Sequence, residues 1–421
     1  MDHSTETHRA IEAVFRIEQA KLVAGLMRMV RDISTAEELA QDALLVALDA
    51  WPKSGVPRNP GAWLMAAAKR KAIDQFRRRK MAERKLDEIG RDLADEEQQI
   101  PDYVSALDDD VGDDLLRLIF TACHPLLARE ARLALTLRLI GGLTTAEIAR
   151  AFLSPEPTIA QRIVRAKRAI AEAGVPFEVP RGDERTARLA SVLEVIYLIF
   201  NEGYSATAGD DWLRPELAEE ALRLGRIVAH LVPDEAEVHG LVALMEIQAS
   251  RTRARTAADG APILLFEQNR ALWDRMLIRR GLVALKRAED LAPVRGPYTL
   301  QASIAACHAR ARRAEETDWQ RIVVLYEILA EVAPNPVVEL NRAVALSYYA
   351  GPAVALDLVD QLAALPALRS YHLLPSVRAD LLVKLGRLEE ARAEFTRAAE
   401  LTGNAREAEL LRERARQCGR G

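Results

Sequence analysis

The sequence predicts an all-α protein, and both its composition and its apolar periodicity support that class. Hydrophobic residues make up 49% of the 421-residue chain but aromatic residues only 5%, and the abundant Ala, Leu, Arg and Glu favour helices over strands. Apolar side chains recur at every third or fourth position over most of the length, as on the buried face of a helix. Because the chain is longer than one hydrophobic core usually serves, we expect two or three helical domains.

Residues 1–80 form the first predicted helical unit. Its apolar periodicity is broken by "WPKSGVPRNPG", where Pro and Gly end one helix and begin another. The three helices that we expect in this unit span 8–31, 35–51 and 60–80.

The second of these helices is expected to carry an acidic surface. Thr35 and Glu38 have the spacing of a capping box, which predicts that the helix begins there. Glu37, Glu38 and Asp42 then lie on its first turns, where a helix tolerates negative charge. Such a surface can receive Arg side chains of a partner.

Charge is distributed unevenly along the chain, although its formal net value is only -4 at pH 7. Residues 61–80 carry seven Lys or Arg against the single Asp74. Acidic residues crowd 92–97 and 108–110, and 81–112 has few large apolar side chains, so we predict an acidic, extended or weakly helical linker there. A basic block is also typical of a solvated helix face, but local positive charge is what nucleic-acid binding requires.

Residues 113–176 form a second predicted helical unit that ends in a helix-turn-helix. Thr144 and Glu147 have capping-box spacing, and Ser154-Pro155 supplies a turn before the second helix. That helix has apolar residues on one stripe and polar or basic residues opposite, which suits the major groove of DNA. A helical hairpin with a soluble basic face remains the alternative for this segment alone. The expected inward residues are Ile148, Phe152, Ile159, Ile163, Ala166 and Ile170, and the expected outer face is Thr158, Gln161, Arg162, Arg165 and Arg168.

Two stretches resemble bacterial sigma factors of the sigma-70 family, and they occur in that family's order. "TAEELAQDALLVALDAW", followed by "PGAWLMAAAKRKAIDQFRRRK", resembles region 2 of the extracytoplasmic-function (ECF) class, and "GLTTAEIARAF" with "PEPTIAQRIVRAKRAI" resembles region 4. The remainder, with "FNEGYSA" and "GPYTLQASIAACHA", is similar to the ECF subgroup that carries a C-terminal tetratricopeptide-like extension. The resemblance implies region 2 at 1–80, the acidic linker at 81–112, region 4 at 113–176 and the helical extension at 185–418.

The resemblance also implies partners, namely RNA polymerase core and promoter DNA, and assigns residues to each. The clamp helices of the polymerase β′ subunit would receive Glu37, Glu38, Gln41 and Asp42, and the β flap would receive region 4. The minus-10 element would contact Trp63, Lys69, Arg70, Asp74, Arg77 and Arg78, where basic and aromatic side chains suit single-stranded DNA, and the loop "KSGVPRN" would hold a flipped base. The minus-35 element would contact Thr158, Gln161, Arg162, Arg165 and Arg168. The acidic linker would thread toward the RNA exit path as a mimic of nucleic-acid charge.

Two positions depart from the family's pattern. Asn is common where Arg70 stands, which leaves the promoter sequence open. Gly is common where Leu153 stands in the helix-turn-helix turn. Because Gly alone reaches positive φ without a Cβ penalty, we expect a locally altered turn at Leu153.

The C-terminal part is expected to be a stacked helical array. Ala391, Phe395 and Ala398 occupy the small, aromatic and small positions of a tetratricopeptide helix, and a weaker copy includes Ala343, Leu346, Ala355 and Val359. Such arrays present a concave surface for a protein or small-molecule partner, although a purely stabilising role stays open. Tyr197, Phe200, Asn201, Glu202 and Tyr204 either line a small-molecule pocket or pack in the core, and core packing is the favoured interpretation.

Several other classes are disfavoured by the sequence. No nucleotide-binding, hydrolase or zinc-protease motif occurs, His124 and His308 lie in apolar contexts, and no catalytic residue, cofactor or metal site is predicted. Cys123, Cys307 and Cys418 lack paired spacing, and neither a membrane span nor a signal peptide is evident, so we expect a cytoplasmic protein without a membrane partner. The remaining alternative is a helix-turn-helix regulator with a tetratricopeptide sensor, which has no need of the acidic and basic surfaces of 1–80.

Overall fold

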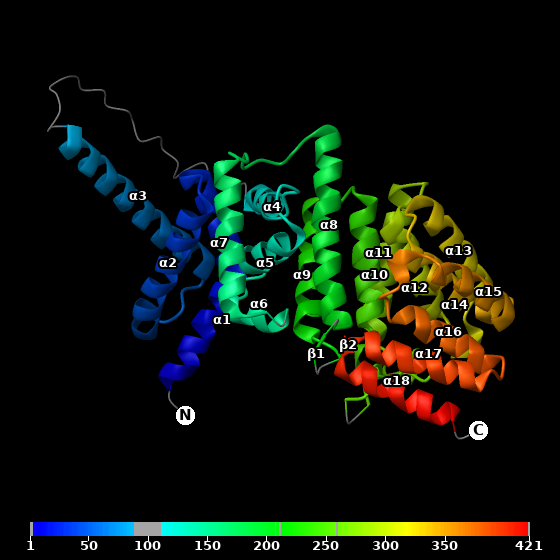
Figure 1. Cartoon of the computed structure of the whole chain (residues 1–421). Coiled ribbons are helices and arrows are strands. Elements are labelled where there is room, and N and C mark those ends of the chain that lie inside the picture. Colours follow the sequence, from blue (N-terminus) through cyan, green and yellow to red (C-terminus); the bar gives the residue numbers. More distant parts are fainter. Residues whose placement is uncertain are drawn as a thin grey trace. The chain divides into compact units, whose positions relative to one another are not determined.

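The computed structural model describes residues 3–87, 111–152, 154–206, 208–209, 212–257 and 260–419. The described chain is helical almost throughout, which confirms the predicted all-α class (Figure 1). It divides into two compact units, 1–195 and 196–421, and the boundary falls within helix α8 (Gly182–Tyr204). The N-terminal unit therefore includes the first part of a helix that the sequence had assigned to the C-terminal array.

Three helices open the N-terminal unit: α1 (His3–Val30), α2 (Ile33–Ser54) and α3 (Pro60–Asp87). They pack against one another, and Trp51 at the end of α2 is fully buried. α3 continues through 81–87, where the sequence predicted the linker to begin, and residues 88–110 lie outside the described part of the chain.

The predicted capping box of α2 is wrong. The Asp32 carboxylate accepts hydrogen bonds from the Thr35 backbone N–H and hydroxyl, both at 2.7 Å, while Asp32 itself has extended backbone angles. Asp is among the strongest N-cap residues, so the helix begins at Ile33 and Thr35 lies inside its first turn. A capping pattern that begins at Thr35 was overridden by the acidic side chain three residues earlier.

The remaining helices of the N-terminal unit are α4 (Val111–Ala122), α5 (Arg129–Leu139), α6 (Thr145–Ala151) and α7 (Glu156–Glu172). The capping box at α6 is confirmed, because Thr144 and Glu147 each bind the other's backbone N–H. The buried stripe of α7 is confirmed too, since Ile159, Ile163, Ala166 and Ile170 are all buried. The altered turn expected at Leu153 lies outside the described residues.

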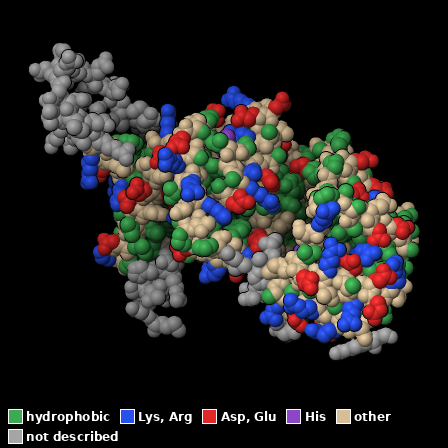
Figure 2. All heavy atoms as spheres, in the orientation of Figure 1, with side chains coloured by type: hydrophobic (Ala, Val, Ile, Leu, Met, Phe, Trp, Pro, Cys, Tyr) green, Lys and Arg blue, Asp and Glu red, His purple; other side chains and the backbone are tan. Residues whose placement is uncertain are grey.

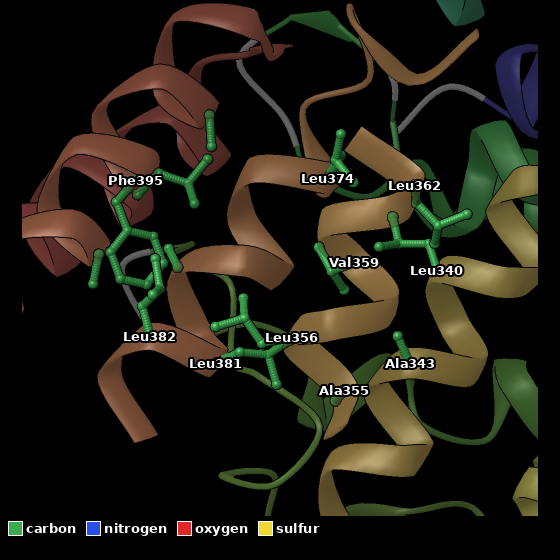
Figure 3. Close-up of a cluster of buried hydrophobic side chains, with 14 of the residues drawn as sticks. Leu340, Ala343, Ala355, Leu356, Val359, Leu362, Leu374, Leu381, Leu382 and Phe395 are labelled. Carbon is green, nitrogen blue, oxygen red and sulfur yellow. The ribbon is translucent and has the colours of Figure 1, made fainter. Parts of the chain in front are cut away.

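The C-terminal unit is a succession of helices in which most helices pack on the next one along the chain. The later helices share a core that includes Leu340, Val359, Leu382 and Phe395. In Figure 3 the side chain of Leu382 lies beside the ring of Phe395. The helices are α9 (Pro215–Leu231), α10 (Ala236–Ala249), α11 (Arg275–Leu291), α12 (Pro297–Arg310), α13 (Trp319–Val332), α14 (Pro336–Tyr349), α15 (Pro352–Ala363), α16 (Leu373–Lys384), α17 (Leu388–Leu401) and α18 (Ala405–Cys418).

Short elements complete this unit. Two-residue strands β1 (Ala208–Gly209) and β2 (Gly403–Asn404) pair in parallel and tie the start of the array to its last helix. The Asn404 side chain supports this junction by donating a hydrogen bond to the carbonyl oxygen of Ala206. The described residues of this unit also form single-turn 3₁₀ helices at Thr252–Ala254, Arg270–Leu272, Ala314–Glu316 and Pro366–Leu368.

Candidate polymerase and nucleic-acid interface

The outer face of α7 carries the residues that the sequence assigned to the minus-35 element. Gln161, Arg165 and Arg168 are exposed, whereas Thr158 and Arg162 are half-buried. Arg168 is bound by Glu172 at 2.6 Å, and this hydrogen bond raises the pKa of its guanidinium. Neither Arg162 nor Arg165 has an ion-pair partner among the described residues. The helix therefore presents two unneutralised arginines beside Gln161, on the side opposite its buried stripe.

The acidic residues of α2 fall into two environments. Glu38 and Gln41 are exposed, and Asp42 is half-buried with one oxygen 3.0 Å from Lys71 of α3. Glu37 is only 4% exposed. Of the four residues assigned to the polymerase clamp, Glu37 is therefore the one that is not at the surface in this conformation.

Glu37 joins α2 to α5 and α7 within the N-terminal unit. One of its carboxylate oxygens accepts a 2.6 Å hydrogen bond from Arg138 Nε of α5, and the other accepts from Lys167 Nζ of α7. A weaker contact from Gln19 Nε2 to the Arg138 carbonyl oxygen lies beside them. Both oxygens of the buried carboxylate are thus used inside the protein, where its negative charge offsets two cations.

A shallow groove of about 350 Å³ separates α2 from α3 and collects residues that the sequence assigned to two different partners. Glu38 and Asp42 line one side, and Asp74 and Arg78 line the other. Polymerase-directed and DNA-directed residues therefore lie side by side along one groove.

The other residues assigned to the minus-10 element are spread around α3. Lys69 and Arg70 line a second groove, of about 700 Å³, between α1 and α3, which also includes Asp114. Burial raises the pKa of that Asp114 carboxyl, against the lowering effect of Arg28 and Arg117. Arg77 is exposed. These basic residues form no single patch, and a strand that contacted all of them would have to wrap around the helix.

Trp63 lies apart from both grooves. Its ring meets the edge of Trp51 with centroids 5.2 Å apart, and Trp63 is half-buried while Trp51 is fully buried. The indole of Trp63 therefore packs against α2 through Trp51, with part of its surface left exposed.

Outside these surfaces, the described residues include a deeply buried thiol. Cys123 is buried against the Thr136 hydroxyl, and burial raises the pKa of its thiol to about 11, which keeps it protonated and unreactive. No group of three or more His, Cys, Asp or Glu side chains capable of holding a metal ion occurs among the described residues. Within the same residues, no helix has the length and hydropathy needed to cross a membrane.

The sequence patterns missed two features of this site, Arg138 and Lys167. Both are basic residues on amphipathic helices and nothing local distinguishes them from solvated ones. They are recognisable only once region 2 and region 4 pack together, since their partner Glu37 lies 101 and 130 residues away.

The capped α6, the buried stripe of α7 and its polar outer face are the features of a helix-turn-helix, and a second helical unit follows along the chain. Comparison with protein families is consistent with this arrangement: residues 14–81 match the model of sigma-70 region 2 and residues 117–170 match that of sigma-70 region 4. Residues 188–289 match a family of unknown function, DUF6596. An uncharacterized protein of Rhizobium meliloti (strain 1021) is 44% identical over 393 residues, covering 93% of this chain and 91% of its own length. The chain therefore carries regions 2 and 4 of the sigma-70 factors of RNA polymerase, followed by a C-terminal part that matches a family of unknown function.

Proposed function

We propose that this protein is an ECF-type sigma factor that directs core polymerase to specific promoters and initiates transcription. The observation that carries the proposal is the outer face of α7, where Arg162 and Arg165 lack ion-pair partners beside the exposed Gln161. Arg and Gln side chains read base edges in the major groove, and uncompensated Arg neutralises phosphates. The matches to sigma-70 regions 2 and 4 support core RNA polymerase as the partner of a protein that carries this DNA-binding face.

The polymerase-docking face is proposed to consist of Glu38, Gln41 and Asp42 of α2, with the β′ clamp helices as partner. Glu38 and Gln41 are exposed and supply negative charge and hydrogen-bonding groups. Glu37 joins this face only after its ion pairs with Arg138 and Lys167 open, because a carboxylate with both oxygens occupied has no site left for a partner's Arg. Region 4 would bind the β flap and the minus-35 element.

The minus-10 element is proposed to lie along the α2–α3 groove and over the exposed Arg77 and Arg78 of α3. Asp74, Arg77 and Arg78 offer polar and basic contacts there, and Trp63 offers an aromatic surface. Lys69 and Arg70 line the neighbouring α1–α3 groove and would contact the same DNA from its other side.

The C-terminal unit is proposed to be a tetratricopeptide-like array that contributes to promoter opening. Burial of Ala391, Phe395 and Ala398 along α17 supports the repeat assignment, as does packing of each of the later helices on the next. A fragment that ends at Val195 would test the role, because it keeps the hydrogen bonds of Arg188 to Phe120 and of Ser191 to Cys123. Loss of transcription by the folded fragment supports a positive role, and higher activity would contradict it.

Sedimentation with promoter DNA separates a sigma factor from an ordinary helix-turn-helix regulator. The protein and core polymerase are purified separately. Each is then mixed with a promoter fragment selected by the reconstituted enzyme, first alone and then together with the other. We expect specific DNA binding only when both are present. Specific binding of duplex DNA by the protein alone, with no increase on adding core polymerase, would favour the regulator.

A further inference from the structure

The C-terminal unit holds three arginines in one neighbourhood without a carboxylate to balance them. Arg255 is 8% exposed, and Arg251 and Arg270 are half-buried. None of the three forms an ion pair with any carboxylate among the described residues. Fully buried guanidinium groups in proteins are rarely left without a partner, so a buried arginine with two half-buried ones beside it and no carboxylate among them requires an explanation.

Aromatic rings bring the three guanidinium groups together. The Arg255 Cζ atom lies 3.6 Å from the centre of the Tyr204 ring, and the Arg270 Cζ atom lies 4.7 Å from the centre of the Trp273 ring. Arg251 shares both rings, at 5.7 Å from that of Tyr204 and 5.9 Å from that of Trp273. Arg251 is therefore the middle member of the group.

Two of the arginines have structural roles that account for their positions. Arg255 donates a hydrogen bond to the Tyr204 carbonyl oxygen, and Arg270 donates to the carbonyl oxygens of His308 and Ala311 at 2.7 and 2.8 Å. These bonds hold the segment between α10 and α11 against the array. Both side chains are thus satisfied by backbone acceptors and aromatic faces.

Arg251 differs because its side chain has no hydrogen-bond acceptor among the described residues. Its Nε atom is buried without a partner, while the side chain as a whole is half-buried and so remains within reach of a solute. A guanidinium can donate five hydrogen bonds in a planar fork, and here the protein accepts none of them.

The other groups near Arg251 supply no negative charge within ion-pair distance of it. Burial, and then the charges of Arg251 and Arg270, lower the pKa of His308 to about 3. The Nδ1 atom of His308 is buried without a hydrogen-bond partner. Burial raises the pKa of the Tyr326 hydroxyl to about 12, so it stays protonated. Glu315 and Glu316 act on Arg270 only at longer range than an ion pair.

We propose that Arg251 is the central residue of a binding site for a phosphate group carried by a small molecule. The planar fork of Arg251 matches phosphate oxygens bidentately, and the adjoining charges of Arg255 and Arg270 favour a doubly charged anion over a single carboxylate. This site lies wholly within the C-terminal unit and goes beyond the sigma function. Its test uses no polymerase and no DNA, so its failure leaves the proposed sigma function untouched.

Thermal unfolding of the full-length protein with inorganic phosphate tests the site. At constant ionic strength set with chloride, we expect phosphate to raise the unfolding temperature with a saturating dose response. Arg251→Gln should weaken the fitted affinity by about tenfold or more. Arg279→Gln, which changes an exposed arginine of α11 that has no ion-pair partner among the described residues, should leave it unchanged.

Two outcomes overturn the proposal: absence of a saturating response in the unaltered protein, or equal phosphate affinity in the Arg251→Gln variant. If that variant does not fold, Arg251→Lys replaces it, since it keeps the charge and removes the fork. If the folded lysine variant binds phosphate about tenfold more weakly, the result supports bidentate recognition. Unchanged phosphate affinity in that variant contradicts it. Citrate, a carboxylate anion, titrated in parallel should bind less tightly, and equal or tighter binding would contradict the assignment to phosphate.

Discussion

Each of the two units of this protein holds a group of arginines without ion-pair partners, and the two groups differ in how deeply they are buried. In the N-terminal unit Arg162 and Arg165 lack ion-pair partners at or near the surface of α7, while its buried cation-binding carboxylate, Glu37, is fully used. In the C-terminal unit three arginines without carboxylates are buried or half-buried among aromatic rings. An exposed arginine can bind a large polyanion such as DNA, whereas a buried or half-buried arginine can be reached only by a small anion. The surface of α17 and α18 differs from both, because its exposed Arg and Glu side chains alternate and pair (Figure 2).

The largest expected effect comes from reversing the exposed acidic charge of α2. Glu38→Arg with Asp42→Arg would place like charges against a basic β′ surface, and co-purification with core polymerase should be abolished, a loss of several kcal/mol. Asp49→Arg, on the same helix in an exposed ion pair with Lys53, is the matched control and should still co-purify. Undiminished co-purification of the double variant would remove α2 from the interface.

The next effect concerns the buried carboxylate that joins the two sigma regions. Glu37→Gln leaves Arg138 and Lys167 without their counter-charge, and the free energy of unfolding of the N-terminal unit should fall by about 3 to 5 kcal/mol. Chemical denaturation, followed by tryptophan fluorescence, measures it. Glu172→Gln removes an exposed partner of Arg168, and its effect on the free energy of unfolding should be much smaller, because water screens an exposed ion pair. Equal effects of the two variants would show that the Glu37 junction is not formed in solution.

A smaller effect distinguishes two arginines of α7. Arg165→Ala should weaken holoenzyme binding to duplex promoter DNA by about 1 to 3 kcal/mol. Arg168→Ala should cost less, because Glu172 already neutralises that side chain. Filter binding at one fixed salt concentration compares the variants. A larger loss for Arg168 would mean that its pairing with Glu172 breaks on DNA.

The smallest expected effect is on the pH dependence of stability, and it tests the buried surroundings of His308 in the C-terminal unit. The pKa of His308 falls from 6.5 to about 3 on folding, because of burial and then of Arg251 and Arg270. Between these pH values the unfolded chain binds a proton that the folded chain does not, so stability falls as the pH falls below 6.5. His308→Gln should reduce the loss of unfolding free energy between pH 6.5 and about pH 5.5 by about 1 kcal/mol. An unchanged pH dependence would place His308 in contact with water.

Local patterns predicted much of this architecture, whereas long-range pairing decided what they missed. The buried stripe of α7 and the capping box at Thr144 depend on residues within one or two helical turns, and both were predictable. Asp32 displaced the expected cap at Thr35 because two capping groups competed within four residues.

The candidate sites divide in the same way. The exposure of Gln161, Arg165 and Glu38 follows from their positions on amphipathic helices. Burial of Glu37 follows from residues more than one hundred positions away, and the position of Arg251 depends on rings contributed by Tyr204 and Trp273. Spacing along the sequence carries no information about such contacts.

Run-off transcription tests the central claim most directly. Core polymerase and the full-length protein are incubated with a linear template that carries a promoter selected by the pair, and the transcript is sized. The sigma assignment predicts a transcript of one defined length that requires the protein and disappears with the Glu38→Arg, Asp42→Arg variant. The sigma assignment would be contradicted by two results together: no template gives a defined transcript, and the protein binds the same duplex without core polymerase.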